Sequence, residues 1–471
     1  MPLRFFNTYS RALEEFQPLD ASGRTVKMYT CGPTVYSHAH IGNFRAYLFE
    51  DLLQRHLELR GYAVKRVMNI TDVDDKTIRG CQAAGVPLAE FTQEFKDAFF
   101  ADLAALRIKP ADTFPEATNP GHINAMVGMI KTLISRDLAY QAEDKSVYFR
   151  IKNFPAYGHL AHFNLDELQS TGRVKNDEYD KEHVGDFALW KAWDEADGAV
   201  RWESPWGPGR PGWHIECSAM ATQILGEQLD LHCGGVDNIF PHHEAEIAQT
   251  EGCTGKQFVR YWLHCAHLLV DGQKMSKSLG NFHTLRDVLA KGYSGREARY
   301  ALLRVHYRAQ LNFTWEGMGE ARQALERIDD WRARLQERSA CVPLAESGQE
   351  QAGRMLYFEE ALDDDLNISA ALGFLFDKIR ETNRTLDQGT LTPTAARGWL
   401  DWWERIDSVL AITADEAELP GEVAQLSEAR AQARLAKDWR RSDELRDQIA
   451  ALGWEVRDSK GGQKVTRRGG A

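Results

Sequence analysis

The stretch Val26-Lys-Met-Tyr-Thr30 alternates between apolar and polar side chains and predicts a β-strand, which Gly32-Pro33 brings to an end. Apolar residues then recur at helical spacing from Phe44 to Leu59, Gly61 is expected to end that helix, and a second strand is predicted from Val64 to Ile70. Strand, helix and strand in this order indicate a parallel, doubly wound sheet. Such a sheet binds ligands at the carboxyl ends of its strands, so we expect the functional site close to Cys31.

The remainder of the chain divides into further regions where the sequence pattern changes. The predicted fold class is α/β: a Rossmann-like, doubly wound parallel sheet with an inserted domain, followed by a helical bundle and a small C-terminal α+β module. We expect the sheet domain in two halves, residues 1–114 and 209–315, around an insertion at residues 115–208. The bundle is expected at residues 316–412 and the C-terminal module at residues 413–471.

Three local patterns are specific enough to be checked. Residues 267–274 read as a hairpin whose turn is Asp271-Gly272. In the C-terminal module, one charged helix is predicted from about Glu422 to Leu452, followed by a hairpin that turns at Gly461-Gly462. The bundle contains one apolar stripe at helical spacing, formed by Leu325, Ile328, Trp331 and Leu335.

Composition limits the class of protein. The 471 residues are 43% hydrophobic and 27% charged, which is typical of a globular protein with a sizeable core. Because there is no long apolar run and no secretory signal, we expect a cytoplasmic protein without a membrane span. The seven cysteines, an odd number, favour a reduced compartment over a disulfide framework. A net charge of −12 argues against unspecific coating of nucleic acid, although the tail after Gly421 is mildly basic.

Four residues could together bind one zinc ion. Pro241 suits a helix start, and His242 and Glu246 are four residues apart, so they share one face of that helix. Zinc prefers four ligands drawn from thiolate, imidazole and carboxylate. Cys31, at the end of the first strand, and Cys217 are the natural sulfur partners.

The four candidate ligands also allow other interpretations. A His/Glu pair at helical spacing is more often a surface ion pair, and Cys233, beside His232, is a rival ligand that spacing does not exclude. A lone cysteine is usually a small buried hydrophobe. We assign four cysteines to that class: Cys81, Cys253, Cys265 and Cys341.

Two motifs indicate nucleotide binding. His40-Ile-Gly42-Asn43 follows the first strand and opens a helix; Gly42 would let a flat base or ribose approach the backbone, and His40 could donate to phosphate oxygens. Lys274-Met-Ser-Lys277-Ser278 brings two ammonium groups to a glycine-flanked loop, where they could stabilise phosphoryl charge. A capping role for the first motif and a solvated basic turn for the second are the simpler alternatives.

With these motifs in place, the chain resembles the bacterial cysteinyl-tRNA synthetases, which are class I aminoacyl-tRNA synthetases. The resemblance runs over nearly the full length. It is carried by Met28–Tyr36, Asn69–Asp72, Arg210–Met220, Phe240–Glu244, Lys274–Phe282, His306–Asn312 and Asp363–Asp365.

The resemblance implies one zinc ion per chain, bound by Cys31, Cys217, His242 and Glu246, and it leaves Cys233 out. In that family the ion holds the side chain of the substrate, L-cysteine. Since zinc prefers a thiolate to a neutral hydroxyl, the site would reject serine without an editing step.

The resemblance also implies a two-step reaction. Cysteine and ATP, accompanied in the family by Mg²⁺, give cysteinyl-adenylate and diphosphate, and the acyl group then passes to tRNA(Cys). The cysteine pocket would contain Thr71, Trp213 and Asp237. The ATP site would contain His40, Gly42, Asn43, Lys274 and Lys277. Asn43 stands where the family often has a second histidine, so its amide brings no charge to this position.

In the tail, Trp439 could stack on an anticodon base and Asp443 could accept from a base edge, although an amphipathic helix with one buried tryptophan explains them too. The resemblance implies a monomer. Two rivals are a cysteine ligase of the mycothiol pathway and a catalytically silent relative that binds tRNA or zinc. The helical and tail regions argue against the first, and the intact lysines and ligand residues argue against the second.

Overall fold

The computed structural model describes residues 2–163, 185–276, 279–340, 351–415, 421–459 and 462–467. The chain forms two compact units. Unit 1 comprises Met1–Leu285, Ala301–Thr314 and Leu356–Leu375, and unit 2 comprises Arg286–Tyr300, Trp315–Met355 and Phe376–Ala471. Within the described ranges, no helix has both the length and the apolar content needed to cross a bilayer.

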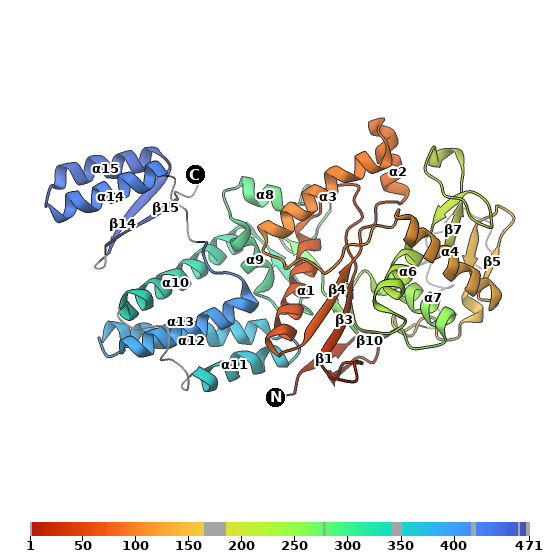
Figure 1. Ribbon diagram of the computed structural model, residues 1–471, viewed down its shortest axis with the longest axis horizontal. Helices are drawn as coiled ribbons and strands as arrows, with labels where there is room; N and C mark the ends of the chain where they lie inside the picture. The colour runs from red at the N-terminus through yellow and green to blue at the C-terminus, as the bar shows by residue number, and fades with distance from the viewer. Residues whose placement is uncertain are drawn as a thin grey trace. The chain divides into compact units, whose positions relative to one another are not determined.

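Unit 1 is built on a four-stranded parallel sheet with the strand order β10–β9–β3–β4. Figure 1 shows helix α1 (Ile41–Leu59) alongside β3 and β4, as expected for a strand–helix–strand unit. The strands are β3 (Thr25–Thr30), β4 (Ala63–Met68), β9 (Leu229–Gly235) and β10 (Val259–Cys265). The predicted parallel α/β sheet is thus confirmed.

The strand order places a topological switch point between β3 and β9. From β3 the chain moves to β4 on one side, and it later returns to the other side of β3 as β9. The connections therefore leave β3 and β9 in opposite directions, which opens a crevice beyond their carboxyl ends. Cys31 follows β3 directly, and Gly234-Gly235 closes β9.

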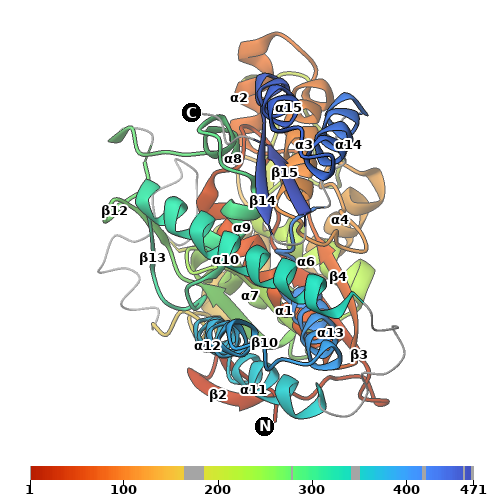
Figure 2. The same ribbon diagram turned by 90° about the vertical axis from the view of Figure 1, so that its left-hand side faces the viewer.

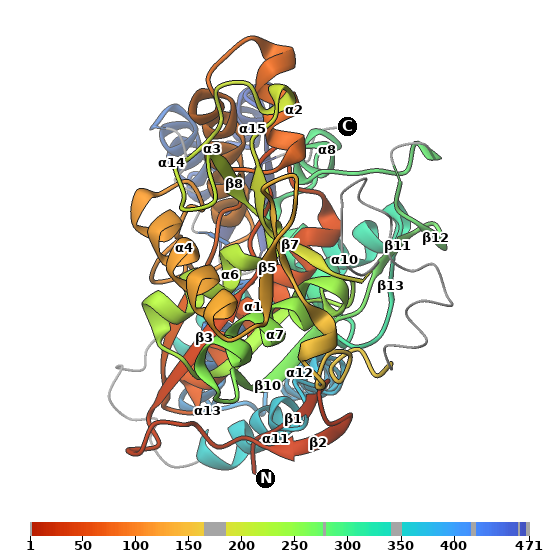
Figure 3. The same cartoon turned by 90° about the vertical axis from the view of Figure 1, so that its right-hand side faces the viewer.

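An antiparallel sheet, β5–β6–β7–β8, lies in the segment between β4 and β9, together with α4 and α6 (Figure 3). Its core contains the stacked rings of Phe149 and Phe187, 5.0 Å apart, and the fully buried Trp190.

The strands of this antiparallel sheet and the helices between β4 and β10 have the following bounds: β5 (Ala139–Gln141), β6 (Val147–Phe149), β7 (Phe187–Ala192), β8 (Gly209–Pro211), α2 (Asp75–Ala84), α3 (Leu88–Ala105), α4 (Pro120–Ser135), α6 (Trp213–Leu225) and α7 (Glu244–Thr254).

The predicted hairpin is confirmed. Strand β11 (Leu268–Val270) pairs antiparallel with β12 (Gln273–Lys274) and parallel with β13 (Leu311–Phe313). The turn residues Asp271 and Gly272 have φ angles of 49° and 74°, the left-handed conformation that tight hairpin turns need. A second hairpin, β1 (Arg4–Asn7) with β2 (Ala12–Glu15), precedes the sheet.

Unit 2 is mainly helical, and its longest helix, α10 (Trp315–Ser339), packs against α13 (Pro393–Leu410) (Figure 2). The predicted stripe on α10 is buried, with Ile328, Trp331 and Leu335 at 0% exposure. Trp331 packs edge-on against two tryptophans of α13. Four further helices contribute to both units: α8 (Leu285–Ala290), α9 (Gly295–Leu303), α11 (Gln351–Asp363) and α12 (Ile368–Asp387).

The C-terminal module differs from its prediction in one respect. The prediction of a single charged helix is wrong, because the chain forms two helices there, α14 (Gly421–Leu435) and α15 (Trp439–Ala451). Lys437 adopts a left-handed φ of 59°, and the Asp438 side chain accepts from the backbone N–H of Arg441, so a new helix is capped there. The hairpin of β14 (Trp454–Ser459) and β15 (Gly462–Arg467) is confirmed.

Asp365 joins three separate segments of unit 1. Its carboxylate accepts from the backbone N–H of Phe6 at 2.8 Å, from the Tyr307 hydroxyl at 2.6 Å and from the Arg308 guanidinium at 2.6 Å. Asp365 is 4% exposed, so these bonds are shielded from water. Two residues before it, Asp363 lies 3.0 Å from the buried His56 of α1.

Replacing Asp365 by alanine should lower the free energy of unfolding of unit 1 by about 1–3 kcal/mol, because the buried Tyr307 hydroxyl and the Phe6 N–H lose their acceptor. Asp365→Asn should be milder, since asparagine keeps one accepting oxygen and tolerates the φ of 59° found here. Urea unfolding measures the difference. The matched control is Asp364→Ala, which removes an ion pair whose carboxylate is 42% exposed and should cost at most about 1 kcal/mol. Equal losses in the two alanine variants would contradict this role of Asp365.

Candidate active site

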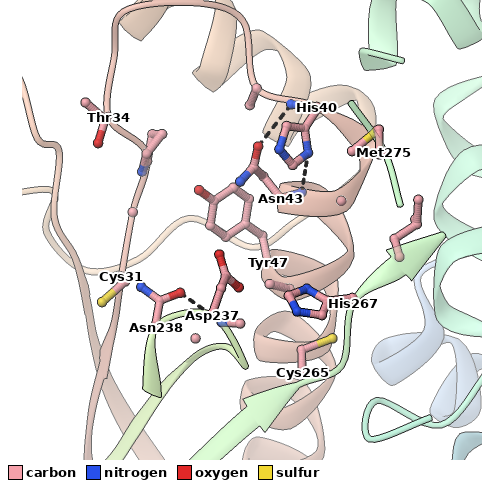
Figure 4. Close-up of a pocket in the computed structure, with 18 of the residues that line it drawn as sticks. Cys31, Thr34, His40, Asn43, Tyr47, Asp237, Asn238, Cys265, His267 and Met275 are labelled. Carbon is pink, nitrogen blue, oxygen red and sulfur yellow. Dashed lines mark hydrogen bonds between the residues drawn. The ribbon is translucent and has the colours of Figure 1, made fainter. Parts of the chain in front are cut away.

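A cavity of about 460 Å³ opens at the switch point of the parallel sheet. It is lined by the loop after β3, the first turns of α1, the end of β9 and the connection from β10 to β11. Figure 4 shows α1 on one side of it with His267 beside the helix, and Asp237 and Asn238 below. The position is the one that the strand pattern predicts for ligand binding.

His40 and Asn43 cap helix α1 reciprocally. The ring Nδ1 of His40 accepts from the backbone N–H of Asn43, and the Asn43 side-chain oxygen accepts from the N–H of His40, both at 3.1 Å. Because Nδ1 is an acceptor, neutral His40 carries its proton on Nε2. The Asn43 amide N–H₂ remains as a donor. Both residues, with Gly42 between them, line the cavity.

Gly42 has no room for a larger side chain. A Cβ atom there would lie 3.0 Å from His40 Nδ1 and 3.2 Å from the Met275 side chain. The bare backbone therefore allows the two motifs to approach each other closely.

The lysine-rich loop reaches the same cavity through Lys274 and Met275. Asn281 holds the loop, since its side-chain oxygen accepts from the N–H of Ser276 at 2.8 Å and its amide donates to the Lys274 carbonyl at 3.2 Å. Lys277 and Ser278, which the sequence also singles out, lie outside the described residues.

The structure brings the four zinc-ligand candidates together. Cys31 follows β3, Cys217 lies in α6, His242 in the short helical turn η3 (Ile239–His243), and Glu246 in α7. One ligand atom from each lies within 4.8 Å of the others, and all four residues are buried. His242 Nε2 is 3.1 Å from Glu246 Oε1. Pro241 precedes α7 by three residues, within η3, so the helix itself starts later than expected.

Burial favours the neutral, uncharged form of all four side chains. It raises the pKa of the Cys31 and Cys217 thiols and of the Glu246 carboxyl, and it lowers the pKa of the His242 imidazole. A divalent cation reverses this balance, because it favours thiolate and carboxylate. Two sulfurs, one imidazole and one carboxylate form a donor set of the kind that zinc prefers.

A second group of donors shares two members with the first. Cys31 and Glu246 also lie within 4.8 Å of His232 and His243. His232 Nε2 is 2.9 Å from Glu246, and His243 lies 3.3 Å from Cys31 Sγ and 2.8 Å from His264. Since this group has one sulfur in place of two, zinc favours the first group. Cys233, the rival suggested by the sequence, is fully buried and belongs to neither group within the described part of the chain.

Of the residues expected in the cysteine pocket, Trp213 and Asp237 line the cavity and Thr71 is not among its lining residues. Trp213 is 44% exposed, and its ring stacks on His242 at 4.3 Å. The Thr71 hydroxyl donates to Glu216 at 2.9 Å and accepts from Asn69 at 3.2 Å. Thr71 thus stands behind the cavity wall, in a network of buried side chains.

Several residues of the cavity wall were not among those predicted from the sequence. Tyr47 and Glu50 follow Asn43 by four and seven residues on α1, so helical spacing from Asn43 could have identified them. Lys76, at the start of α2, places its ammonium 4.7 Å from the ring of Tyr36. No pattern in the sequence brings Lys76 to this cavity.

Arg45 fixes one wall of the cavity from behind. Its guanidinium donates to the carbonyls of Ala266 at 2.7 Å and His267 at 2.8 Å, and also to that of Ala309. Arg45 is 2% exposed. Helix α1 is thereby tied to the cavity-lining segment after β10.

The two candidates for RNA contact lie in unit 2. Trp439 begins α15 and is 57% exposed, and the Arg434 guanidinium lies 5.7 Å from its ring. Asp443 is one turn further along α15, 3.7 Å from Arg446. The tryptophan is therefore an exposed platform, which rules out the simpler interpretation of a buried ring.

Three family models match the chain. The catalytic domain of class I tRNA synthetases (C) matches residues 16–323, the DALR domain matches residues 357–412, and the cysteinyl-tRNA ligase anticodon-binding domain matches residues 416–465. Among known proteins, the cysteine–tRNA ligase of Chlamydia felis is 52% identical over 470 residues, covering 99% of this chain and 98% of that protein. The cysteine–tRNA ligase of Protochlamydia amoebophila is 48% identical with the same coverage.

Solved structures with a similar fold include the methionyl-tRNA synthetase of Mycobacterium tuberculosis in complex with methionyl-adenylate. It has a TM-score of 0.61 at 17% identity and covers 82% of this chain and 89% of its own. The LeuRS of Agrobacterium radiobacter, in a ternary complex with tRNA, has a TM-score of 0.59 at 12% identity and covers 85% of this chain and 86% of its own. At such low identity these likenesses show the fold alone.

Replacing Arg45 by methionine should loosen the cavity wall, because the carbonyls of Ala266, His267 and Ala309 lose their donor. We expect amide hydrogen exchange in residues 263–268 to become about tenfold faster or more. The matched control is Arg55→Met on the same helix, whose guanidinium bonds Asp51 and the Arg107 carbonyl at 2.9 Å. If Arg45→Met leaves exchange in residues 263–268 unchanged, Arg45 does not hold this wall.

Proposed function

This chain belongs to the cysteine–tRNA ligase family of class I aminoacyl-tRNA synthetases, and on that premise we propose that Cys31, Cys217, His242 and Glu246 hold one zinc ion that selects the amino acid. The observation that carries the proposal is the convergence of four buried zinc-ligand side chains, from four separate elements, at the edge of the cavity.

The enzyme activates L-cysteine with ATP and transfers the product to tRNA(Cys). In the first step the cysteine carboxylate attacks the α-phosphorus of ATP, which gives cysteinyl-adenylate and diphosphate. In the second step a terminal ribose hydroxyl of the tRNA takes the cysteinyl group and AMP leaves. Neither step needs a protein nucleophile, so the protein contributes positioning and charge stabilisation.

The proposed role of the cluster is selection of the substrate thiol. When bound, zinc supplies a positive charge that favours a thiolate ligand over a neutral hydroxyl. The chain's own contribution is a buried donor set with Cys31 at the cavity wall and with Trp213 stacked on His242 beside it. A site that requires one polar partner can reject its analogue by about 10⁴–10⁵, and this is sufficient against serine.

We propose that Asp237 accepts from the α-amino group of cysteine and that Trp213 forms an apolar wall of its pocket. Both line the cavity close to Cys31, which supports this assignment. For Thr71 we propose an indirect role, since its hydroxyl is bonded to Glu216 and Asn69.

For ATP, we propose that His40 donates from Nε2 to a phosphate oxygen and that Gly42 and Asn43 lie against the nucleotide. Lys274 and Lys277 would stabilise the charge that develops on the phosphates during the reaction. The meeting of His40, Asn43 and Lys274 at one cavity supports this. Mg²⁺ would accompany ATP, as is usual for phosphoryl chemistry.

We further propose that the enzyme acts as a monomer in the cytoplasm. The monomer rests on the family resemblance. The described cysteines are all free thiols, which supports a reducing compartment.

Charging of tRNA(Cys) with radiolabelled cysteine tests the whole assignment. Charging is expected, since residues 416–465 match an anticodon-binding domain. Cysteine-dependent pyrophosphate exchange without charging would favour the mycothiol-type ligase, and absence of both would favour a silent relative.

Cys217→Ser should remove most of the zinc, because a serine hydroxyl is not deprotonated as a thiol is near a metal. We expect the preference for cysteine over serine in pyrophosphate exchange to fall at least 100-fold. Metal analysis and the two kcat/KM values measure these effects. The matched control is Cys81→Ser, a buried thiol on α2 whose Sγ is 3.1 Å from the Ile78 carbonyl. Full zinc content and unchanged discrimination in Cys217→Ser would overturn the zinc proposal.

Trp439→Ala should raise the KM for tRNA(Cys) in charging by about tenfold, since stacking on a base contributes about 1–3 kcal/mol. Pyrophosphate exchange, which needs no tRNA, should be unchanged. Asp443→Asn should give a smaller increase. If the KM for tRNA is the same in Trp439→Ala and the parent enzyme, Trp439 is not part of the RNA contact.

A further inference from the structure

Tyr47 is a cavity residue without an assigned role. It lies one turn after Asn43 on α1, and Figure 4 shows its ring between Asn43 and Asp237. Both Tyr47 and Asp237 line the cavity, as does Cys31 of the metal-ligand cluster. The hydroxyl of Tyr47 is thus placed in the part of the cavity where the amino acid is proposed to bind.

The ring of Tyr47 is held in a fixed orientation. It is 4% exposed and packs edge-on against Phe44 at 5.9 Å and against Phe99 at 5.6 Å. A ring locked by such contacts loses little further conformational entropy when its hydroxyl binds a ligand. Tyr47 is therefore suited to a positioning role.

The Tyr47 hydroxyl has a free proton to donate. Burial raises the pKa of this phenol well above its usual value, and the nearby acidic groups Glu50, Cys31 and Asp237 raise it further, so the hydroxyl stays neutral. Among the described residues, it has no hydrogen-bond partner. Because Tyr47 lines the cavity, its hydroxyl is open to a ligand bound there and has no protein acceptor to give up first.

The chemistry of the substrate indicates which of its groups this donor meets. Cysteine presents a thiol, an ammonium group and a carboxylate on neighbouring carbons. The metal-ligand cluster is proposed for the thiol and Asp237 for the ammonium group, which leaves the carboxylate in need of a donor. A neutral hydroxyl orients a carboxylate oxygen without the strong charge pairing that a lysine or arginine would add, so the oxygen stays nucleophilic.

We propose that Tyr47 is a substrate-contacting residue whose hydroxyl donates to the carboxylate of cysteine and orients it toward ATP. This inference rests on the proposed cysteine site. It adds a third anchoring point to that site: the cluster holds the sulfur, Asp237 the ammonium group and Tyr47 the carboxylate. Three fixed points are enough to define the direction in which the carboxylate attacks.

Tyr47→Phe tests the inference, because it removes one oxygen atom and leaves the ring in place. In the full-length enzyme loaded with zinc, we expect the KM for cysteine in pyrophosphate exchange to rise about tenfold, with the KM for ATP and the zinc content unchanged. L-cysteinol, which lacks the carboxylate, is the discriminating probe. Direct titration should show weaker binding of cysteine to the variant and equal binding of cysteinol to both proteins.

The matched control is Tyr261→Phe, which removes a buried hydroxyl that donates to the Glu15 carbonyl at 2.8 Å within strand β10, away from the cavity. It should leave both KM values unchanged. An unchanged KM for cysteine in Tyr47→Phe would overturn the inference, as would equal loss of cysteine and cysteinol binding or a rise in the KM for ATP alone. Absence of zinc or of cysteine-dependent exchange in the parent enzyme would instead contradict the proposed function.

Discussion

The burial of four ionisable side chains at one point is the constraint on which the site depends. Without a cation, burial favours the neutral forms of the Cys31 and Cys217 thiols, of the Glu246 carboxyl and of the His242 imidazole. Groups of this kind are not gathered in an apolar interior without compensation, because each of them could be solvated elsewhere. In the function proposed above, a sulfur-preferring divalent cation would provide that compensation. The same cation would make the cavity selective for a thiol substrate.

The parallel sheet determines where this cluster lies. Cys31 follows β3 at the switch point, so the cluster meets, through Cys31, the same cavity that His40 and Lys274 line. Arg45 then ties α1 to the segment after β10. The amino acid and the nucleotide are thereby expected to meet on a rigid framework, which is what a reaction without a protein nucleophile requires.

The helical spacing of His242 and Glu246 was a sound prediction of their proximity, although His242 lies in the turn before α7. Spacing could not choose among further ligands, because His232 and Cys233 are adjacent in sequence on β9. Alternate residues of a strand point to opposite faces, and only His232 reaches Glu246. The burial of Thr71 behind the cavity wall was likewise invisible, since it depends on Glu216, which lies 145 positions away in the chain.

The parallel sheet, the lysine-loop hairpin, the helical regions and the family could be predicted from the amino-acid sequence, because all of these follow from local periodicity or from motifs in a fixed order. The folded chain was needed to show which donors share one point and that Tyr47 and Lys76 line the cavity. It also decided that the charged tail helix is broken near Lys437. These features share one cause. Each depends on burial and on contacts between segments that are distant in the sequence, and local patterns do not encode such contacts.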